Sequence, residues 1–134
     1  MNLKVLLSGK WTILTPTKQN GLSELEEFIA GLGSNFEASL AGVFTMMEQH
    51  CSYGPEHFNS SQCHYVDQKE QIYQYSKGRI RVFWFEDDDK VVICTHGLLK
   101  KTQKTPRQEI QRAIKVKERY NRAKQNGSLS IGED

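Results

Sequence analysis

The sequence has 134 residues, of which 37% are hydrophobic and 25% are charged, and this composition predicts one globular domain large enough to bury a core. The N-terminus lacks the pattern of a secretory signal and no stretch approaches the ~20 apolar residues of a membrane span, which argues against secreted and membrane-spanning classes. Three cysteines cannot all pair within one chain, which favours a reducing, cytoplasmic location, and the formal net charge is +2.

The first fourteen residues are predicted to be extended. Two apolar runs flank Ser8-Gly9, which can form a tight hairpin turn. A short helix is predicted next, because Ser23 and Glu26 have the spacing of a capping box and two glycines then end the apolar pattern.

A longer helix is predicted after Ser34, which has Glu37 three residues later. Apolar residues then recur at helical spacing until Gly54-Pro55, where the helix should end. We interpret this stripe as core, and it comprises Phe36, Leu40, Val43, Phe44 and Met47. Residues 52–68 lack periodicity and are interpreted as a loop that enters a strand.

A three-stranded antiparallel meander is predicted from Gln71 onward, because β-branched and aromatic residues dominate and are interrupted at Lys77-Gly78 and at the acidic run 87–89. Alternation in the middle strand assigns side chains to two faces. One face carries Arg79, Arg81, Phe83 and Phe85, and the other carries Ile80, Val82 and Trp84.

The last predicted element is a helix that starts near Thr105-Pro106, where Thr105 can cap and Gln108 can close a capping box. One face of this helix is apolar and carries Ile110, Ala113, Ile114 and Tyr120. The opposite face is a basic ridge that comprises Arg112, Lys115, Arg119 and Arg122.

The charge is distributed unevenly along the chain. Residues 97–126 contain ten basic residues and two acids, a net charge of +8, so the rest of the chain carries −6. A basic block on an otherwise acidic protein is typical of a polyanion-binding surface, and the alternative is a solvated lysine-rich helix.

Residues 81–113, RVFWFEDDDKVVICTHGLLKKTQKTPRQEIQRA, resemble the phage-derived, HigB-like branch of the RelE/ParE toxins of type II toxin–antitoxin systems. Arg81 precedes the aromatic run, His96-Gly97 ends the next strand, and the run Lys-Lys-Thr-Gln-Lys-Thr-Pro spans residues 100–106. The looser resemblance extends over roughly residues 20 to 125.

The resemblance implies an α+β, RelE-like fold with two N-terminal helices and a C-terminal helix packed on a small antiparallel sheet. We expect one RelE-like domain over residues 1–126 and a disordered tail over residues 127–134. It also implies a ribosome-dependent mRNA endoribonuclease that uses 2′-OH attack without a metal or cofactor. The implied partners are mRNA, the 70S ribosome and a cognate, HigA-like helix-turn-helix antitoxin.

Three positions depart from the family pattern. Family members usually carry Glu and a basic residue where this chain has Gln74 and Ser76, and often Phe where it has Leu98. RelE also has a tyrosine soon after the basic turn, whereas residues 104–108 contain none.

The candidate catalytic residues are Arg81, Lys100, Lys101, Lys104 and His96. The planar guanidinium of Arg81 suits a phosphate clamp, and the alternative is a surface pair with Asp87 or Glu86. Lys100 and Lys101 follow the neighbouring strand at the end of the sheet where Arg81 is expected. Crowding of positive charge near Arg81 would lower the pKa of a lysine, so that one of them could act as a proton shuttle. The alternative is that both only bind phosphate electrostatically. The candidate RNA-binding residues are Arg79, Gln103, Arg107, Arg112, Lys115, Arg119 and Arg122.

Histidines offer two further hypotheses. His96 could titrate near neutral pH, although its place at the end of an apolar strand favours a structural histidine bonded to the backbone. Five potential metal ligands fall within fifteen residues, namely His50, Cys51, His57, Cys63 and His64, but their spacing matches no standard zinc pattern, so no metal is expected.

Two other function classes remain open. A ParE-like inhibitor would act on DNA gyrase by protein contact and would not need the Arg81–Lys100–Lys101 cluster. A non-catalytic RNA- or DNA-binding module would bind in a salt-dependent way without producing cleavage.

Overall fold

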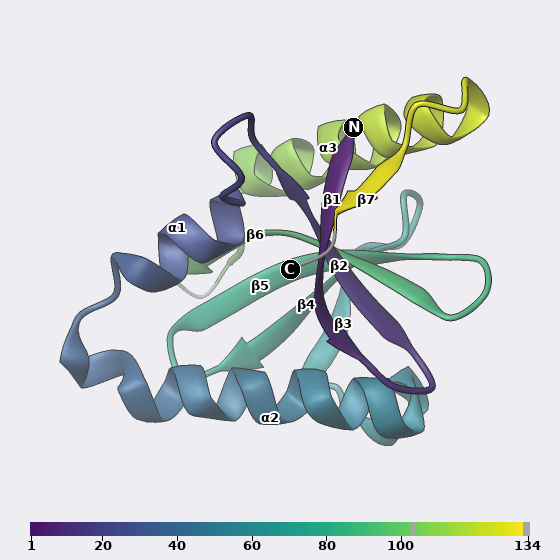
Figure 1. Cartoon of the computed structure of the whole chain (residues 1–134). Coiled ribbons are helices and arrows are strands. Elements are labelled where there is room, and N and C mark those ends of the chain that lie inside the picture. The colour runs from purple at the N-terminus through teal and green to yellow at the C-terminus, as the bar shows by residue number, and fades with distance from the viewer. Residues whose placement is uncertain (103, 133–134) are drawn as a thin grey trace.

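The computed structural model describes residues 1–102 and 104–132, which form a seven-stranded mixed sheet and three α-helices (Figure 1). The strands are β1 (Asn2–Ser8), β2 (Thr12–Thr17), β3 (Cys63–Asp67), β4 (Ile72–Lys77), β5 (Ile80–Asp87), β6 (Val91–Leu99) and β7 (Ser130–Gly132), and the helices are α1 (Glu24–Ala30), α2 (Glu37–Tyr53) and α3 (Arg107–Gln125). The strand order is β3-β4-β5-β6-β2-β1-β7.

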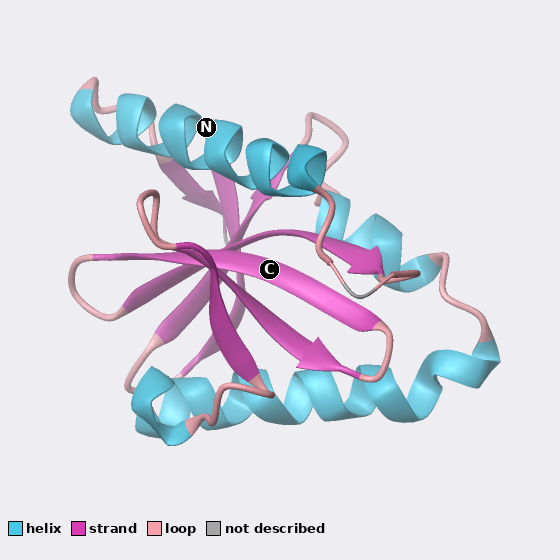
Figure 2. Cartoon of the chain, turned by 180° about the vertical axis from the view of Figure 1, so that it is seen from behind, coloured by secondary structure: helices cyan, strands magenta, loops and turns pink. Residues whose placement is uncertain are grey.

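Helices cover both faces of the sheet. Figures 1 and 2 show α2 and α3 on opposite sides of it. Leu25 of α1 and Val43 of α2 share one apolar cluster, whereas Ile110 of α3 packs with Phe83 in the other. The sheet is therefore the middle layer between two apolar interfaces.

The prediction of two N-terminal helices and a C-terminal helix on a small antiparallel sheet is wrong. The predicted meander is present as β4, β5 and β6, but β2 pairs with β6 in parallel, so the N-terminal hairpin joins the same sheet. Ile13 and Leu14 point to opposite faces of β2, and both are buried, at 0% and 3% exposure. A strand that is apolar on both faces is stable only inside a covered sheet, which explains why the hairpin is incorporated.

The alternation predicted for the middle strand is confirmed. Val82 and Trp84 lie in the cluster under α1 and α2, and Phe83 and Phe85 lie in the cluster under α3. Arg81 lies two residues before Phe83, so its side chain is on the same face of β5, the face that α3 covers.

The helix starts follow the predicted signals only in part. Ser23 and Glu26 form the predicted capping box at α1. At α2 the chain instead makes a 3₁₀ turn, and the helix begins after Phe36 without a side-chain cap. At α3 the N-cap is Pro106, because the hydroxyl of Thr105 donates to Oε1 of Gln74 at 3.2 Å instead of capping the helix.

The segment expected to be a disordered tail contains β7, which pairs in parallel with β1 over three residues. The N-terminal amine of Met1 also donates to the carbonyl of Ser128 at 2.9 Å. Among residues 1–102 and 104–132, no helix combines the length and the apolar character needed to cross a bilayer.

Gly97 allows α1 to lie close against β6. A Cβ atom at this position would lie 2.3 Å from Cδ2 of Phe28, so the ring would have to move. We expect Gly97→Ala to lower the free energy of unfolding by about 1–3 kcal/mol, measured by chemical denaturation. The matched control is Gly31→Ala, whose Cβ would approach nothing closer than 3.6 Å, and an equal loss in both variants would contradict this steric explanation.

Candidate functional site

Basic side chains from β5, from the turn before it and from the residues that follow β6 surround one open pocket of about 440 Å³, which we call the basic pocket. Its lining residues are Gly78, Arg79, Arg81, Lys100, Lys101 and Thr102. Antiparallel pairing of β5 with β6 places Arg81 opposite Leu98, and the amide of Lys100 donates to the carbonyl of Arg79 at 2.8 Å. The strand register therefore brings together cations that are about twenty residues apart in the sequence.

Arg81 is half-buried and held by the β4–β5 turn. Its Nη1 donates to the carbonyl oxygens of Gly78, at 2.7 Å, and Ile80, at 2.9 Å. Its Nε is buried and has no hydrogen-bond partner among the residues that the structure describes. Burial lowers the pKa of the guanidinium, which nevertheless stays charged at any physiological pH.

The alternative surface pair for Arg81 does not form. Asp87 instead accepts hydrogen bonds from Lys124 and from the hydroxyl of Tyr120. The side chain of Glu86 lies on the face of β5 opposite to that of Arg81. Within the described part of the chain, Arg81 thus has no carboxylate partner and its charge is not neutralised.

The two lysines after β6 differ in their surroundings. Partial burial is the larger cause, and the nearby charge of Arg81 the smaller, of a lowered pKa at Lys100. Lys101 is exposed on the rim of the same pocket. A lowered pKa makes an ammonium group a better proton donor, so Lys100 is the better placed of the two for proton transfer.

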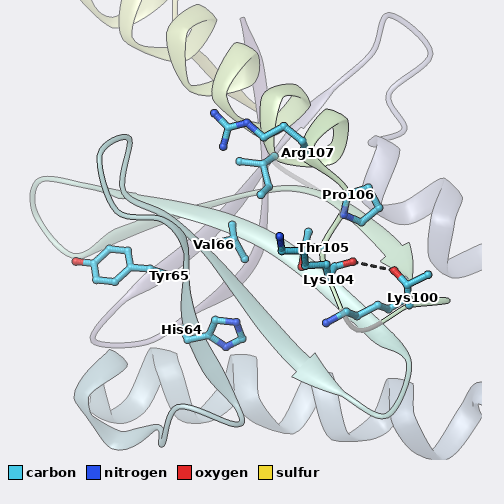
Figure 3. Close-up of a pocket in the computed structure, with 10 residues that line it drawn as sticks. His64, Tyr65, Val66, Lys100, Lys104, Thr105, Pro106 and Arg107 are labelled. Carbon is cyan, nitrogen blue, oxygen red and sulfur yellow. Dashed lines mark hydrogen bonds between the residues drawn. The ribbon is translucent and has the colours of Figure 1, made fainter.

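A second pocket of about 690 Å³, which we call the β3 pocket, lies between β3, the turn after β6 and the N-terminus of α3 (Figure 3). Lys104, Arg107 and His64 line it, and Figure 3 shows the ring of Tyr65 pointing away from it. Lys100 and Thr102 line both pockets, so the two are contiguous.

A polar network connects two residues of the β3 pocket, His64 and Thr105, through Gln74 of β4. The amide of Gln74, which is 1% exposed, contacts Nε2 of His64 at 3.3 Å and donates to Oγ of Ser76 at 3.3 Å. Its oxygen accepts from Thr105. Gln74 and Ser76, the two β4 positions that depart from the family pattern, are therefore joined to His64 and to the loop before α3.

His96 lies outside both pockets. It is 2% exposed, its Nε2 contacts Oε2 of Glu109 at 2.7 Å and its Nδ1 contacts Oγ1 of Thr95 at 2.9 Å. Burial, and secondarily the charge of Arg112, lowers its pKa. This placement corrects the sequence-based hypothesis of an accessible titrating group and favours a structural role, although through side chains and not through the backbone.

The basic ridge of α3 is only partly available to a ligand. Arg112 is paired with Glu24 of α1 and also lies 3.6 Å from Glu109, whereas Lys115, Arg119 and Arg122 are exposed. Arg107 is paired with Asp67 at 3.1 Å, and its side chain is still 65% exposed. Gln103, also a predicted RNA-binding residue, lies outside the described residues.

The five potential metal ligands of residues 50–64 are dispersed. His50 and Cys51 are buried, whereas His57 is exposed. Over the described ranges, histidine, cysteine and acidic side chains form no group of three or more that could hold a metal ion.

Sequence reasoning missed the place of His64, which it considered only as a metal ligand. The pairing of β3 with β4 puts His64 opposite Gln74 and thus beside the β3 pocket. No short-range pattern identifies that partner, because residues 52–68 lack periodicity.

Both pockets lie within the part of the chain that matches a known protein family. The family described as "Phage derived protein Gp49-like (DUF891)" matches residues 27–118, which is more than half of the chain and includes every residue that lines either pocket. No curated protein matches the chain significantly. This family is part of the RelE/toxin–antitoxin-like superfamily. The chain therefore belongs to the Gp49-like family of phage-derived proteins, which is associated with the toxins of toxin–antitoxin systems.

Proposed function

We propose that this protein is the toxin of a type II toxin–antitoxin system, of the HigB-like type, and that it is a ribosome-dependent mRNA endoribonuclease. The observation that carries the proposal is the basic pocket, where Arg79, Arg81, Lys100 and Lys101 surround about 440 Å³ and none of the described lining residues is acidic. Family membership supports it, because Gp49-like proteins are toxin-related and often RNases.

Metal-independent cleavage of RNA requires stabilisation of the negative charge that develops on the phosphorane oxygens. Arg81 is suited to this task, because two carbonyl groups fix its guanidinium through Nη1, and its Nη2 makes no hydrogen bond to the described residues and can donate to a phosphate oxygen. Lys100 would protonate the leaving 5′ oxygen, while Lys101, Lys104 and Arg79 would bind flanking phosphates. This chemistry needs no cofactor.

The ribosome would supply what this small site lacks. Orientation of the RNA in the decoding centre can account for a large part of the barrier reduction, so a site with few proton-transfer groups suffices. The exposed ridge residues Lys115, Arg119 and Arg122 would bind rRNA, with Arg107 at the near end and Arg112 contributing less because it is paired.

The family relationship also supports an antitoxin partner. We propose a HigA-like helix-turn-helix protein in that role, acting in the cytoplasm, where mRNA and 70S ribosomes are present. Such a partner would neutralise the toxin when the two are co-expressed.

Induction of the wild-type chain in a bacterial host, followed by primer extension on cellular mRNA, tests the proposal. We expect cuts that recur at codon-spaced positions within translated regions, and we expect none when the antitoxin is co-expressed. Gyrase-linked DNA breaks with intact mRNA would overturn the proposal in favour of a ParE-like inhibitor. Salt-dependent RNA binding without any cleavage product would instead indicate a non-catalytic binding module.

A further inference from the structure

The side chain of His64 is exposed at the edge of the β3 pocket. Its Nδ1 lies 3.0 Å from the carbonyl oxygen of Ser60. A carbonyl oxygen only accepts hydrogen bonds, so Nδ1 carries the proton, and in the neutral ring Nε2 then carries the lone pair. His64 is therefore held in the tautomer that can accept a proton at Nε2.

The present partner of that lone pair is replaceable. Gln74 reaches Nε2 of His64 at 3.3 Å, which is long for a hydrogen bond. The same amide also donates to Ser76, and its oxygen accepts from Thr105. Gln74 can therefore release His64 to a ligand hydroxyl without being left unpaired in the protein interior.

His64 and Arg81 lie on the same face of the sheet. β4 separates their strands, and Gln74 pairs with His64 while Ser76 pairs with Arg81. Two strand spacings across and two residues along correspond to a separation on the order of 12 Å between the two Cα atoms. Both side chains are long enough to reach a nucleotide held between them.

Lys100 connects the two sites, since it lines the pocket of His64 and the pocket of Arg81. Figure 3 shows the imidazole of His64 on the side of its strand that faces the pocket. The other charged groups around His64 are Lys104 and Arg107, and Arg107 is paired with Asp67. Among the described residues that line either pocket, His64 is the one imidazole, and no carboxylate is present.

We propose that His64 is a catalytic residue of the RNA cleavage and that its Nε2 accepts the proton of the attacking 2′-hydroxyl, an inference that rests on the proposed function. The 2′ oxygen forms a bond to phosphorus as its proton passes to His64. The bond from phosphorus to the 5′ oxygen breaks, the electron pair leaves on that oxygen, and Lys100 donates a proton to it. The products are a 2′,3′-cyclic phosphate and a 5′-hydroxyl, and proton exchange with water restores His64 and Lys100.

The test uses purified full-length protein and 70S ribosomes programmed with a short defined mRNA. Single-turnover cleavage is measured for the wild type and for His64→Gln, whose amide cannot take up a proton. We expect cleavage to slow by about 100-fold or more, with ribosome binding changed by no more than about twofold. His57→Gln is the matched control, because it replaces an exposed histidine outside both pockets.

The pH profile separates a proton-transfer role from a structural one. For the wild type we expect the cleavage rate to fall on acidification, since a general base must be unprotonated to accept the proton of the 2′-hydroxyl. The residual activity of His64→Gln should lack this fall. Thermal melting checks that the variant is folded.

The outcomes distinguish the inference from the function on which it rests. If the wild type cleaves, Arg81→Ala does not, and His64→Gln cleaves at the wild-type rate, the role of His64 is refuted and the function stands. If His64→Gln loses ribosome binding in proportion to cleavage, His64 is a binding residue and the inference is overturned. If the wild type itself leaves the programmed mRNA intact, the proposed function fails.

Discussion

Arg81→Ala is expected to abolish growth arrest in cells and to slow cleavage of ribosome-bound mRNA by at least about 100-fold. The guanidinium is the group in the basic pocket that the fold holds most firmly, through the carbonyls of Gly78 and Ile80. It is also the group that has a planar fork for phosphate oxygens, and its Nη2 makes no hydrogen bond to the described residues. Its removal should therefore affect the transition state more than the binding of RNA.

The structural cost of this substitution should be small enough to keep the protein folded. Loss of the two bonds to the β4–β5 turn should cost about 1–3 kcal/mol, so antitoxin binding should survive, which co-purification checks. Arg81→Lys retains the charge but loses the fork, and it should be nearly as inactive as alanine. Lys10→Ala, in the β1–β2 turn at the opposite end of the sheet, is the control for loss of one surface cation. Full growth arrest by Arg81→Ala would leave the proposed site without its central residue.

The second large effect concerns His50, which is expected to make the protein sensitive to acid. Its side chain is fully buried among aromatic rings that include Trp11 and Trp84, and its Nδ1 lies 2.7 Å from the hydroxyl of Tyr75. Its Nε2 has no partner among the described residues. Burial lowers the pKa of His50 from its ordinary value of 6.5 to about 4, because the apolar surroundings disfavour the charged ring.

The sign of the effect follows from proton binding. Between pH 6.5 and about 4 the unfolded chain takes up a proton at His50 and the folded protein does not, so acidification stabilises the unfolded state. The free energy of unfolding should therefore be unaffected by His50 above pH 6.5, decrease as the pH falls through this window, and reach a loss of about 3 kcal/mol near pH 4.

Denaturant unfolding at pH 7 and pH 4, for the wild type and for His50→Gln, isolates this contribution. Glutamine is polar, as histidine is, but does not titrate. Carboxylates such as Glu26 and Asp87 also lose stabilising interactions when acid protonates them, because lysine partners lower their pKa values despite burial. This loss of unfolding free energy is the same in both proteins. The variant should thus lose about 3 kcal/mol less than the wild type. Equal losses would show that His50 is protonated in the folded state as readily as in the unfolded chain.

Signals that depend on neighbouring residues determined much of the local structure. The Ser23–Glu26 box starts α1 because both partners lie within one helical turn. The two-residue period of β5 sorts Trp84 and Phe83 onto opposite faces, and the helical period of α3 buries Ile110. The family motif at residues 100–106 likewise identified the turn that carries Lys100, because a motif is a property of consecutive residues.

Which side chains are available at the candidate site depends on contacts between residues that are distant in the sequence. Whether Arg112 is free or paired with Glu24, 88 residues away, is decided by how α3 and α1 pack on the two faces of one sheet. Whether the hydroxyl of Thr105 accepts from a backbone N–H at the start of α3 or donates to Gln74 is a choice between two partners that the sequence does not rank.

The sequence by itself determined most of the helices and strands, although not β7, which of their faces are apolar, and that a basic turn follows β6. Only the tertiary structure decided that β2 pairs with β6, that the sheet has seven strands within the described residues, and that His64 stands at a pocket shared with Lys100. The physical reason is that period and capping act over a few residues, whereas strand partners are chosen by burial summed over the whole fold.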